Sequence, residues 1–178
     1  MKVATDTELV EAAAGGDIES FGKLCERHYA AMTALAYSVL ADHHLAEDAA
    51  QETFARALTN LQRLKDGRKL AGWLAAICRN VAKDMLAAKT RNLDSEAGLR
   101  TADKTHEGDY GDLMRRALMR LPSGAREIIV LRYYDGLSYD EIASVSGVSR
   151  AAINGRLTRA KRKLAQYLSR FGFAEDKS

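Results

Sequence analysis

The sequence predicts an all-α fold in which a flexible linker joins two small helical domains. A chain of 178 residues has room for one ordinary domain or two small ones. Its 30 Ala and 21 Leu far outnumber its 13 Val and Ile, and Ala and Leu lose little side-chain freedom in a helix. A protein built from βαβ units would show several short Val/Ile runs, whereas this chain has only Ile128–Leu131.

Apolar residues at helical spacing, together with capping signals, place the helices on either side of the linker. The first expected helix begins after Asp17, a plausible N-cap. The expected helices cover about 18–39, 45–61, 70–88, 113–121, 123–134, 139–145 and 150–170. Residues 92–112 contain three Gly and six acidic residues but no Val, Ile, Phe, Trp or Met, which is too little apolar surface to repay the entropy of ordering them. We therefore expect domains at 1–91 and 113–178, with a flexible acidic linker at 92–112.

The last two expected helices have the pattern of a helix-turn-helix. Ser138 and Glu141 form a capping box, Gly147 allows a sharp three-residue turn, and Ser149 caps the final helix. Residues 149–163 include six basic residues and no acidic one, which suits a helix lying between DNA phosphates with its N-terminal residues at base edges. The alternative is a solvated basic helix. The residues expected at the DNA are Arg150, Ala151, Asn154, Gly155, Arg156, Thr158, Arg159 and Arg162.

The formal net charge of +3 is the sum of two unequal parts. Residues 1–112 carry 14 Lys and Arg against 18 Asp and Glu, a net charge of −4. Residues 113–178 carry 13 against 6, a net charge of +7. A basic segment of this kind favours a polyanionic partner.

The helix expected at 45–61 has an acidic outer face. Ala50, Phe54, Ala57, Leu58 and Leu61 are expected to face the core, and the opposite stripe holds Asp48, Glu52, Ala55 and Thr59, with Gln51 and Arg56 at its edges. Such a stripe fits a basic partner protein, although by itself it is more simply explained as a solvated helix face.

The loop and helix that follow form a second basic region. Residues 63–91 hold eight Lys and Arg against two Asp. Trp73, Asn80 and Lys83 share a stripe beside the expected core face, and an aromatic ring, an amide and a cation together can stack on and hydrogen-bond exposed bases. A tryptophan at the start of a helix also fits simple packing.

The sequence shows no catalytic, cofactor or metal constellation. Its four His have no Cys or carboxylate at zinc-ligand spacing, and it has neither a glycine-rich phosphate loop nor a nucleophile elbow. Cys25 and Cys78 are far apart and are expected to be reduced, buried apolar residues. No run of about 18 apolar residues and no signal peptide is present. We therefore expect a cytoplasmic protein that is not an enzyme and does not insert into a membrane.

Two sets of motifs, one on each side of the linker, resemble a known family. The first comprises His44–Ala57 (HLAEDAAQETFARA) and Leu70–Asp84 (LAGWLAAICRNVAKD). The second comprises Leu121–Arg132 (LPSGAREIIVLR), Gly136–Ala143 (GLSYDEIA) and Gly147–Ser149. These segments are similar to regions 2 and 4 of the extracytoplasmic-function (ECF) sigma factors of bacterial RNA polymerase, a family that lacks the region in between.

The resemblance implies a protein that binds the core of RNA polymerase and directs promoter-specific transcription initiation. It implies that Asp48, Gln51 and Glu52 bind the clamp coiled coil of the polymerase, and that region 4 binds the polymerase flap. The basic loop and third helix would melt and hold the minus-ten box, and the last helix would read the minus-thirty-five box. An anti-sigma factor is expected to hold such a protein inactive. The residues expected at the minus-ten box are Arg68, Lys69, Trp73, Arg79, Asn80 and Lys83.

Two other interpretations are compatible with parts of the sequence. One is a sigma mimic that binds an anti-sigma factor without reading DNA, although the six basic residues of the last helix argue against mimicry. The other is an ordinary helix-turn-helix repressor whose first domain senses a ligand. Association with core polymerase and a promoter-specific transcript distinguish a sigma factor from both.

Overall fold

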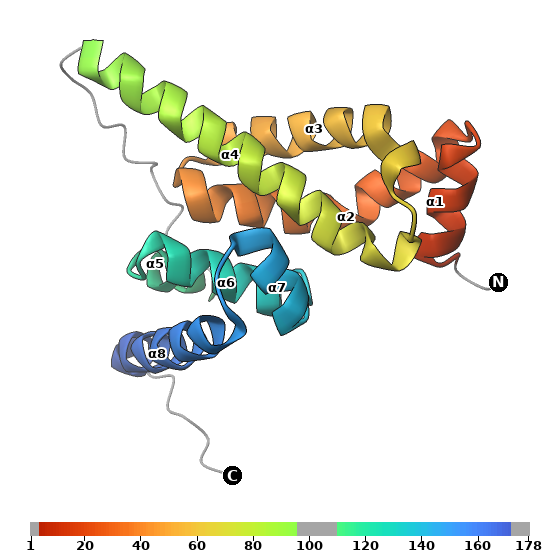
Figure 1. Ribbon diagram of the computed structural model, residues 1–178. Helices are drawn as coiled ribbons and strands as arrows, with labels where there is room; N and C mark the ends of the chain where they lie inside the picture. Colours follow the sequence, from red (N-terminus) through yellow and green to blue (C-terminus); the bar gives the residue numbers. More distant parts are fainter. Residues whose placement is uncertain (1–3, 96–109, 172–178) are drawn as a thin grey trace.

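The computed structural model describes residues 4–95 and 110–171, which form eight α-helices and short 3₁₀ turns, with no strand among them (Figure 1). The prediction of an all-α fold is confirmed. The helices are α1 (Asp6–Ala14), α2 (Ile18–Leu40), α3 (His43–Asn60), α4 (Leu70–Ser95), α5 (Tyr110–Met119), α6 (Ser123–Tyr133), α7 (Tyr139–Ser146) and α8 (Arg150–Leu168).

Helices α1 to α4 form an N-terminal unit around α2. Asp17 caps α2 as predicted, because its carboxylate accepts hydrogen bonds from the backbone N–H groups of Glu19 (3.0 Å) and Ser20 (3.3 Å). Helices α2, α3 and α4 pack on one another, and small side chains allow them to approach closely. The fully buried alanines on these helices are Ala36, Ala46, Ala49, Ala50, Ala57, Ala75 and Ala82.

Helix α1 was not predicted from the sequence, although a local signal for it exists. Thr5 and Glu8 form a capping box of the same kind as the one recognised at Ser138. The helix is fastened to α2 by Asp6, whose carboxylate pairs with Arg27 and lies 2.9 Å from Nε2 of His28. Burial raises the pKa of Asp6, but its hydrogen bonds with these two residues outweigh this effect and leave it below the ordinary value.

Helices α5 to α8 form a C-terminal unit that contains the predicted helix-turn-helix. The α6–α7 turn places Gly136 at φ 71°, and Ser138 and Glu141 close the capping box of α7. Gly147 ends α7 at φ 70°, in the left-handed region that favours glycine. The hydroxyl of Ser149 then accepts a hydrogen bond from the backbone N–H of Ala152 (3.3 Å), which starts α8.

The expected linker is helical at both ends. Helix α4 continues to Ser95 and α5 begins at Tyr110, while residues 96–109 lie outside the described part of the chain. Residues 86–95 contain good helix formers, and Nζ of Lys89 lies 2.7 Å from a carboxylate oxygen of Asp42, the N-cap of α3. The end of α4 therefore has a tertiary contact that the sequence pattern does not show.

The prediction that Leu58 belongs to the core is wrong. Leu58 is 44% exposed, whereas Thr53 is fully buried and donates its hydroxyl to the carbonyl oxygen of Ala49 (2.6 Å). Because this hydrogen bond satisfies the hydroxyl inside the helix, threonine can take a core position. The buried stripe of α3 therefore includes Thr53 and leaves Leu58 outside it. His43 and His44, which precede the helix expected at 45–61, are the first residues of α3.

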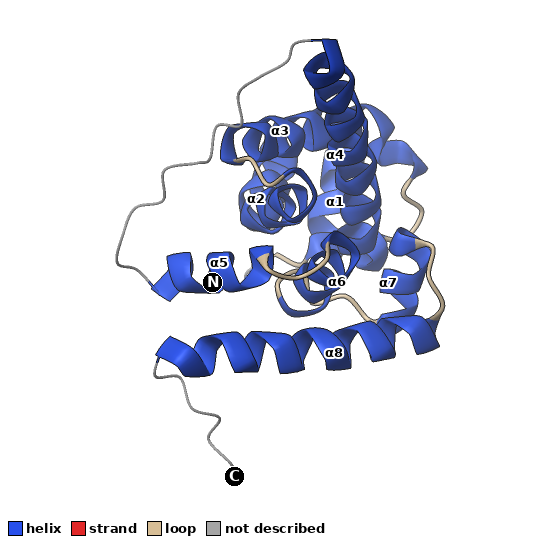
Figure 2. Ribbon diagram, turned by 90° about the vertical axis from the view of Figure 1, so that its left-hand side faces the viewer, coloured by secondary structure: helices blue, strands red, loops and turns tan. Residues whose placement is uncertain are grey.

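The two units pack against each other. Helix α6 lies on α2 and α7 lies on α4, and a single cluster of buried apolar side chains extends from Leu9 in α1 to Ala160 in α8. Figure 2 shows α5, α6 and α7 between α8 and the N-terminal helices. Among the described helices, none is long and apolar enough to cross a bilayer.

Substitution of Gly67 tests how the loop before α4 is anchored. A Cβ at Gly67 would lie 2.7 Å from the backbone Cα of Thr7, so Gly67→Ala is expected to lower the free energy of unfolding by about 1–3 kcal/mol in urea denaturation. The matched control is Gly22→Ala within α2, where no atom beyond the neighbouring backbone of the helix lies within 4 Å of the added methyl group, and it is expected to stabilise by up to ~1 kcal/mol. Equal stability of Gly67→Ala and the wild type would contradict this packing.

Candidate nucleic-acid and protein interfaces

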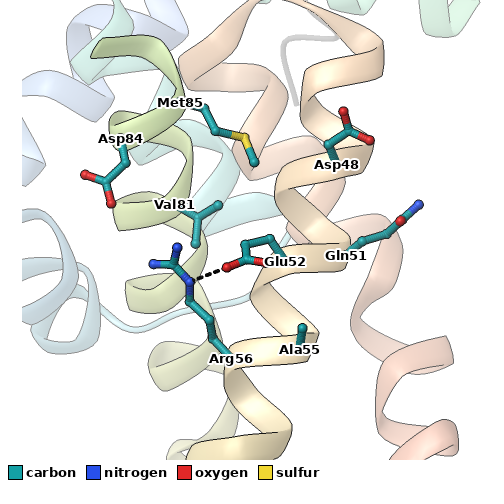
Figure 3. Close-up of a pocket in the computed structure, with 8 residues that line it drawn as sticks. All are labelled: Asp48, Gln51, Glu52, Ala55, Arg56, Val81, Asp84 and Met85. Carbon is teal, nitrogen blue, oxygen red and sulfur yellow. Dashed lines mark hydrogen bonds and ion pairs between the residues drawn. The ribbon is translucent and has the colours of Figure 1, made fainter. Parts of the chain in front are cut away.

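The outer face of α3 and the adjoining face of α4 form a shallow hollow of about 540 Å³ (Figure 3). Asp48 and Gln51 are exposed on its α3 side, and Glu52 is half-buried there. From α4, the half-buried Met85 supplies apolar surface, while Val81 lines the hollow but is only 1% exposed. The hollow also includes Ala55, Arg56 and Asp84. Its carboxylates beside apolar surface suit a partner that offers both cations and apolar side chains.

The carboxylate of Glu52 is already paired with a cation on its own helix. Nε of Arg56, one turn later, donates to it over 2.7 Å, and both side chains are more than 40% exposed. An exposed pair of this kind contributes only about 0.3–0.5 kcal/mol. Glu52 can therefore exchange Arg56 for the cation of a partner at little cost. The sequence predicted the α3 side of this hollow, including Asp48, Gln51 and Glu52, but it did not indicate that Asp84 and Met85 of α4 line the other side.

The loop before α4 presents two cations. Arg68 and Lys69 are exposed on the 3₁₀ turn Gly67–Lys69. The guanidinium of Arg68 donates to Asp66 over 3.0 and 3.1 Å, and this side-chain hydrogen bonding, with the backbone N–H of Arg68, keeps the pKa of the Asp66 carboxyl below its ordinary value. Both residues are therefore accessible to a phosphate backbone.

The expected minus-ten residues on α4 fall into two groups. Asn80 and Lys83 are exposed and close enough along the helix to contact one strand together. Trp73 is half-buried and packs against the hydrophobic core, which agrees with the packing interpretation and leaves part of its ring accessible.

Arg79 points to the C-terminal unit. Its guanidinium pairs with the carboxylate of Glu127 in α6, and its Nη2 donates to the backbone oxygen of Ser146, at the end of α7, over 3.2 Å. Only 16% of the Arg79 side chain and 9% of the Glu127 side chain are exposed. The structure therefore separates Arg79 from the other expected minus-ten residues.

The start of α8 presents its expected DNA-facing residues openly. Arg150, Ala151 and Asn154 are exposed and line a hollow with Tyr139. The guanidinium of Arg150 lies 5.8 Å from the centre of the Tyr139 ring and 3.3 Å from a carboxylate oxygen of Asp140. These contacts hold Arg150 on the side of the turn, close to where the N-terminal residues of a recognition helix meet base edges.

The remaining residues of α8 lie farther along the helix. Thr158, Arg159 and Arg162 are exposed, and Gly155 is half-buried beneath the guanidinium of Arg159. Arg156 is half-buried and reaches back to Gly124 near the start of α6. With Arg159 and Lys163 it lines a hollow of about 370 Å³ against the α5–α6 junction. Helical spacing predicts Ile153, Leu157, Ala160 and Leu164 on the inward stripe of α8. The first three are at most 2% exposed, as predicted, whereas Leu164 is half-buried against the core.

A buried carboxylate that the sequence did not single out lies at the α6–α7 turn. Both carboxylate oxygens of Asp135 are enclosed and find no hydrogen-bond partner among the described residues. Burial raises the pKa of Asp135 to about 7. The pKa of the Cys78 thiol in α4 rises to about 12, mainly through burial and in part through the charge of Asp135. Asp135 is enclosed by packing between segments that are distant in sequence, so its position in a turn does not predict its burial. Both cysteines are free, but only Cys78 is buried as predicted, whereas Cys25 is half-buried.

Comparison with known proteins agrees with this arrangement. The family models described as Sigma-70 region 2 and Sigma-70, region 4 match residues 24–92 and 111–164. RNA polymerase sigma factor CnrH of Cupriavidus metallidurans is 31% identical over 92% of this chain and 94% of its own length. ECF RNA polymerase sigma factor EcfG of Rhodopseudomonas palustris is 32% identical over 77% of this chain and 78% of its own length. The chain belongs to the ECF family of RNA polymerase sigma factors.

Solved sigma-factor structures have the same fold. CnrH in complex with the cytosolic domain of CnrY aligns with a TM-score of 0.66 and 30% identity over 92% of this chain and 97% of that chain. The sigma factor RpoE in complex with the anti-sigma factor NepR from Bartonella quintana aligns with a TM-score of 0.74 and 27% identity over 85% and 98%. Some relatives are longer, since the match spans only 41% of the probable sigma factor RfaY of Xanthomonas campestris.

The two family matches correspond to the two helical units of this sigma factor. The region 2 match begins inside α2 and ends in α4, and the region 4 match covers α5 to most of α8. Helix α1 and the first turns of α2 precede the region 2 match. The acidic hollow and basic loop therefore lie on the region 2 side, and the helix-turn-helix lies on the region 4 side.

The variant Asp135→Asn tests the burial of this carboxylate through the pH dependence of the unfolding free energy. Below about pH 4 the carboxyl is protonated in both the folded and unfolded chains; between about pH 4 and 7 the unfolded chain ionises first, so the unfolding free energy falls. Asn cannot ionise, so the advantage of the variant over the wild type should grow across this window, by up to about 4 kcal/mol, and level off above pH 7. Urea denaturation at several pH values measures it. The exposed Asp140→Asn is the matched control, and an advantage of Asp135→Asn that did not change with pH would contradict the burial.

Proposed function

We propose that this sigma factor docks on core RNA polymerase through the hollow between α3 and α4 and reads a promoter with α4 and α8. The observation that carries this proposal is the separation of an acidic, partly apolar hollow in region 2 from the basic, exposed α8 of region 4. The family supports a role in the cytoplasm, where polymerase and chromosome are found. Reconstitution with core polymerase and a promoter library tests the whole proposal, and no promoter-specific transcript would reject it.

Polymerase docking is assigned to Asp48, Gln51 and Glu52. Their accessible oxygens fit a basic segment of the clamp coiled coil, and the half-buried Met85 offers apolar surface next to them. The helix-turn-helix unit is assigned to the flap. Because charge complementarity mainly sets encounter rate and orientation, docking should weaken as salt concentration rises.

Minus-ten recognition is assigned to the loop and the exposed edge of α4. Arg68, Lys69 and Lys83 are accessible cations that can bind the phosphates of a separated strand. Asn80 and the accessible part of Trp73 offer a hydrogen-bonding amide and a stacking surface for an unpaired base. These contacts would help offset the few kcal/mol that unstacking a base costs. Arg79 belongs to the same proposed set.

Minus-thirty-five recognition is assigned to α8. Arg150, Ala151 and Asn154 at its start are placed for base edges, with Gly155 allowing close approach of the helix backbone. Arg156, Thr158, Arg159 and Arg162 are assigned to phosphates. An anti-sigma factor is the proposed regulator, supported by the aligned structures, in which RpoE is bound to the anti-sigma factor NepR and CnrH to the cytosolic domain of CnrY.

Charge reversal on α3 tests the docking face. Asp48→Lys combined with Glu52→Lys is expected to weaken association with core polymerase by at least about tenfold, because two attractive contacts become repulsive. DNA binding by α8 should be unaffected. The matched control is Glu11→Lys with Glu26→Lys, which makes the same charge change on exposed positions of α1 and α2. Equal affinity of the α3 variant and this control would reject the docking face.

Arg159→Ala tests the assignment of a phosphate contact on α8. The variant is expected to bind all promoter sequences less tightly by a similar factor and to flatten the plot of log affinity against log salt by about one unit. Binding titrations on duplexes with varied minus-thirty-five boxes measure both quantities. A change in base preference would show instead that Arg159 reads a base.

A further inference from the structure

A further hollow, of about 680 Å³, lies where α2 meets α5 and α6, and we call it the tyrosine hollow. Tyr29 and Tyr37 of α2 and Tyr134 at the end of α6 line it with aromatic rings. Leu118 of α5 and Val130 of α6 add aliphatic surface. A largely apolar cavity of this size, with few polar groups, is typical of a site for a small organic ligand. It shares no residue with the acidic hollow of α3 and α4.

The tyrosine hollow is also lined by Arg126 of α6, a buried cation that no carboxylate of the described residues neutralises. Arg126 is only 8% exposed, and its Nε atom is enclosed with no hydrogen-bond partner in the described part of the chain. Its Nη1 contacts Sδ of Met119, and a thioether is a weak acceptor that carries no charge. Burial, opposed in part by the nearby Tyr37, lowers the pKa of Arg126, but a guanidinium stays protonated at neutral pH. Its positive charge is therefore present and lacks a counter-ion.

The other polar groups of this lining do not compensate the charge of Arg126. The hydroxyls of Thr33 and Ser38 each donate to a carbonyl oxygen of α2, over 3.0 and 2.7 Å. Glu47 supplies a carboxylate, but its side chain is 45% exposed and lies 3.7 Å from Nδ1 of His43. Arg115 of α5 adds a second positive charge. A buried cation of this kind costs free energy, which an anionic ligand in the hollow would recover.

We propose that the tyrosine hollow binds a small organic acid that has one carboxylate and an apolar body. The guanidinium of Arg126 recognises the carboxylate, because a guanidinium can donate two parallel hydrogen bonds to it. The tyrosine rings and aliphatic side chains of the lining bury the apolar body. A single carboxylate matches the charge of Arg126, whereas a phosphate monoester carries nearly two negative charges. The proposal does not rest on the polymerase or promoter assignments, so its tests need neither partner.

Octanoate and octanol, which have alkyl chains of equal length, test whether the hollow selects a carboxylate. Titration of the isotope-labelled full-length chain, followed by heteronuclear NMR at neutral pH, measures the affinity and the location of both compounds. Octanoate is expected to saturate one site per chain, to shift resonances of α2, α5 and α6, and to bind at least about tenfold more tightly than octanol. Equal affinity for the two compounds, or shifts confined to other helices, overturns the proposal.

Arg126→Met tests the cation directly. Methionine keeps much of the length of the side chain and removes an unneutralised charge from the interior, so the variant is expected to fold. It should bind octanoate about tenfold less tightly and octanol as tightly as the wild type does. Arg126→Lys keeps the charge and should restore part of the affinity for octanoate. Arg116→Met, on the exposed face of α5, is the matched control and should change neither affinity. Unchanged octanoate binding by Arg126→Met overturns the role of Arg126.

Ala30→Trp tests the apolar part of the site. Ala30 lines the hollow but is exposed on α2, so a large ring there narrows the hollow without entering the core. The variant should bind both octanoate and octanol at least about fivefold less tightly, whereas Ala12→Trp on the exposed face of α1 should bind both normally. Added salt should change the octanoate affinity little, because a buried ion pair is weakly screened. Octanoate binding that is lost at high salt, or is equal in the two variants, overturns the buried location.

Discussion

The ion pair between Arg79 and Glu127 is the interaction on which the arrangement of the two regions depends. It joins α4 of the N-terminal unit to α6 of the C-terminal unit, and the second hydrogen bond of Arg79 ends on Ser146, just before the turn into α8. A buried pair contributes little net stability, but each partner is costly to leave alone. Region 4 is therefore held in one position while this ion pair is intact. It can separate when a phosphate or water replaces the carboxylate of Glu127 at Arg79.

Local charge gives one nearly neutral chain separate surfaces that suit different proposed partners. The acidic hollow of α3 and α4, the cations of the α4 loop and the basic α8 are separate surfaces, and each is accessible on its own. Asp135 adds a condition, because burial raises its pKa to about 7 and its ionisation weakens the folded, closed chain near neutral pH.

Local features of the fold were predictable from sequence, whereas contacts between distant segments were not. Asp17, Ser138 and Ser149 start their helices as expected, since caps depend on neighbouring backbone groups. The capping box of α1 depends on the same kind of neighbouring groups and is equally visible in the sequence. Helical periodicity predicts Leu58 in the core, because it gives no sign that the Thr53 hydroxyl finds a hydrogen-bond acceptor within its own helix. The partner of Arg79 lies 48 residues away in sequence, and no local pattern predicts such a pairing. The assigned polymerase and DNA contacts remain predictions.

The distance between regions 2 and 4 in solution tests the account most directly. Labels at Glu11→Cys in α1 and Gln166→Cys in α8, both exposed positions, can be placed in a Cys25→Ser background and measured by electron spin resonance. We predict one short distance in the free chain and an increase of several tens of ångströms when core polymerase and a promoter duplex are added, as the spacing of the two boxes requires. The same distance in the free chain and in the promoter complex would contradict the account.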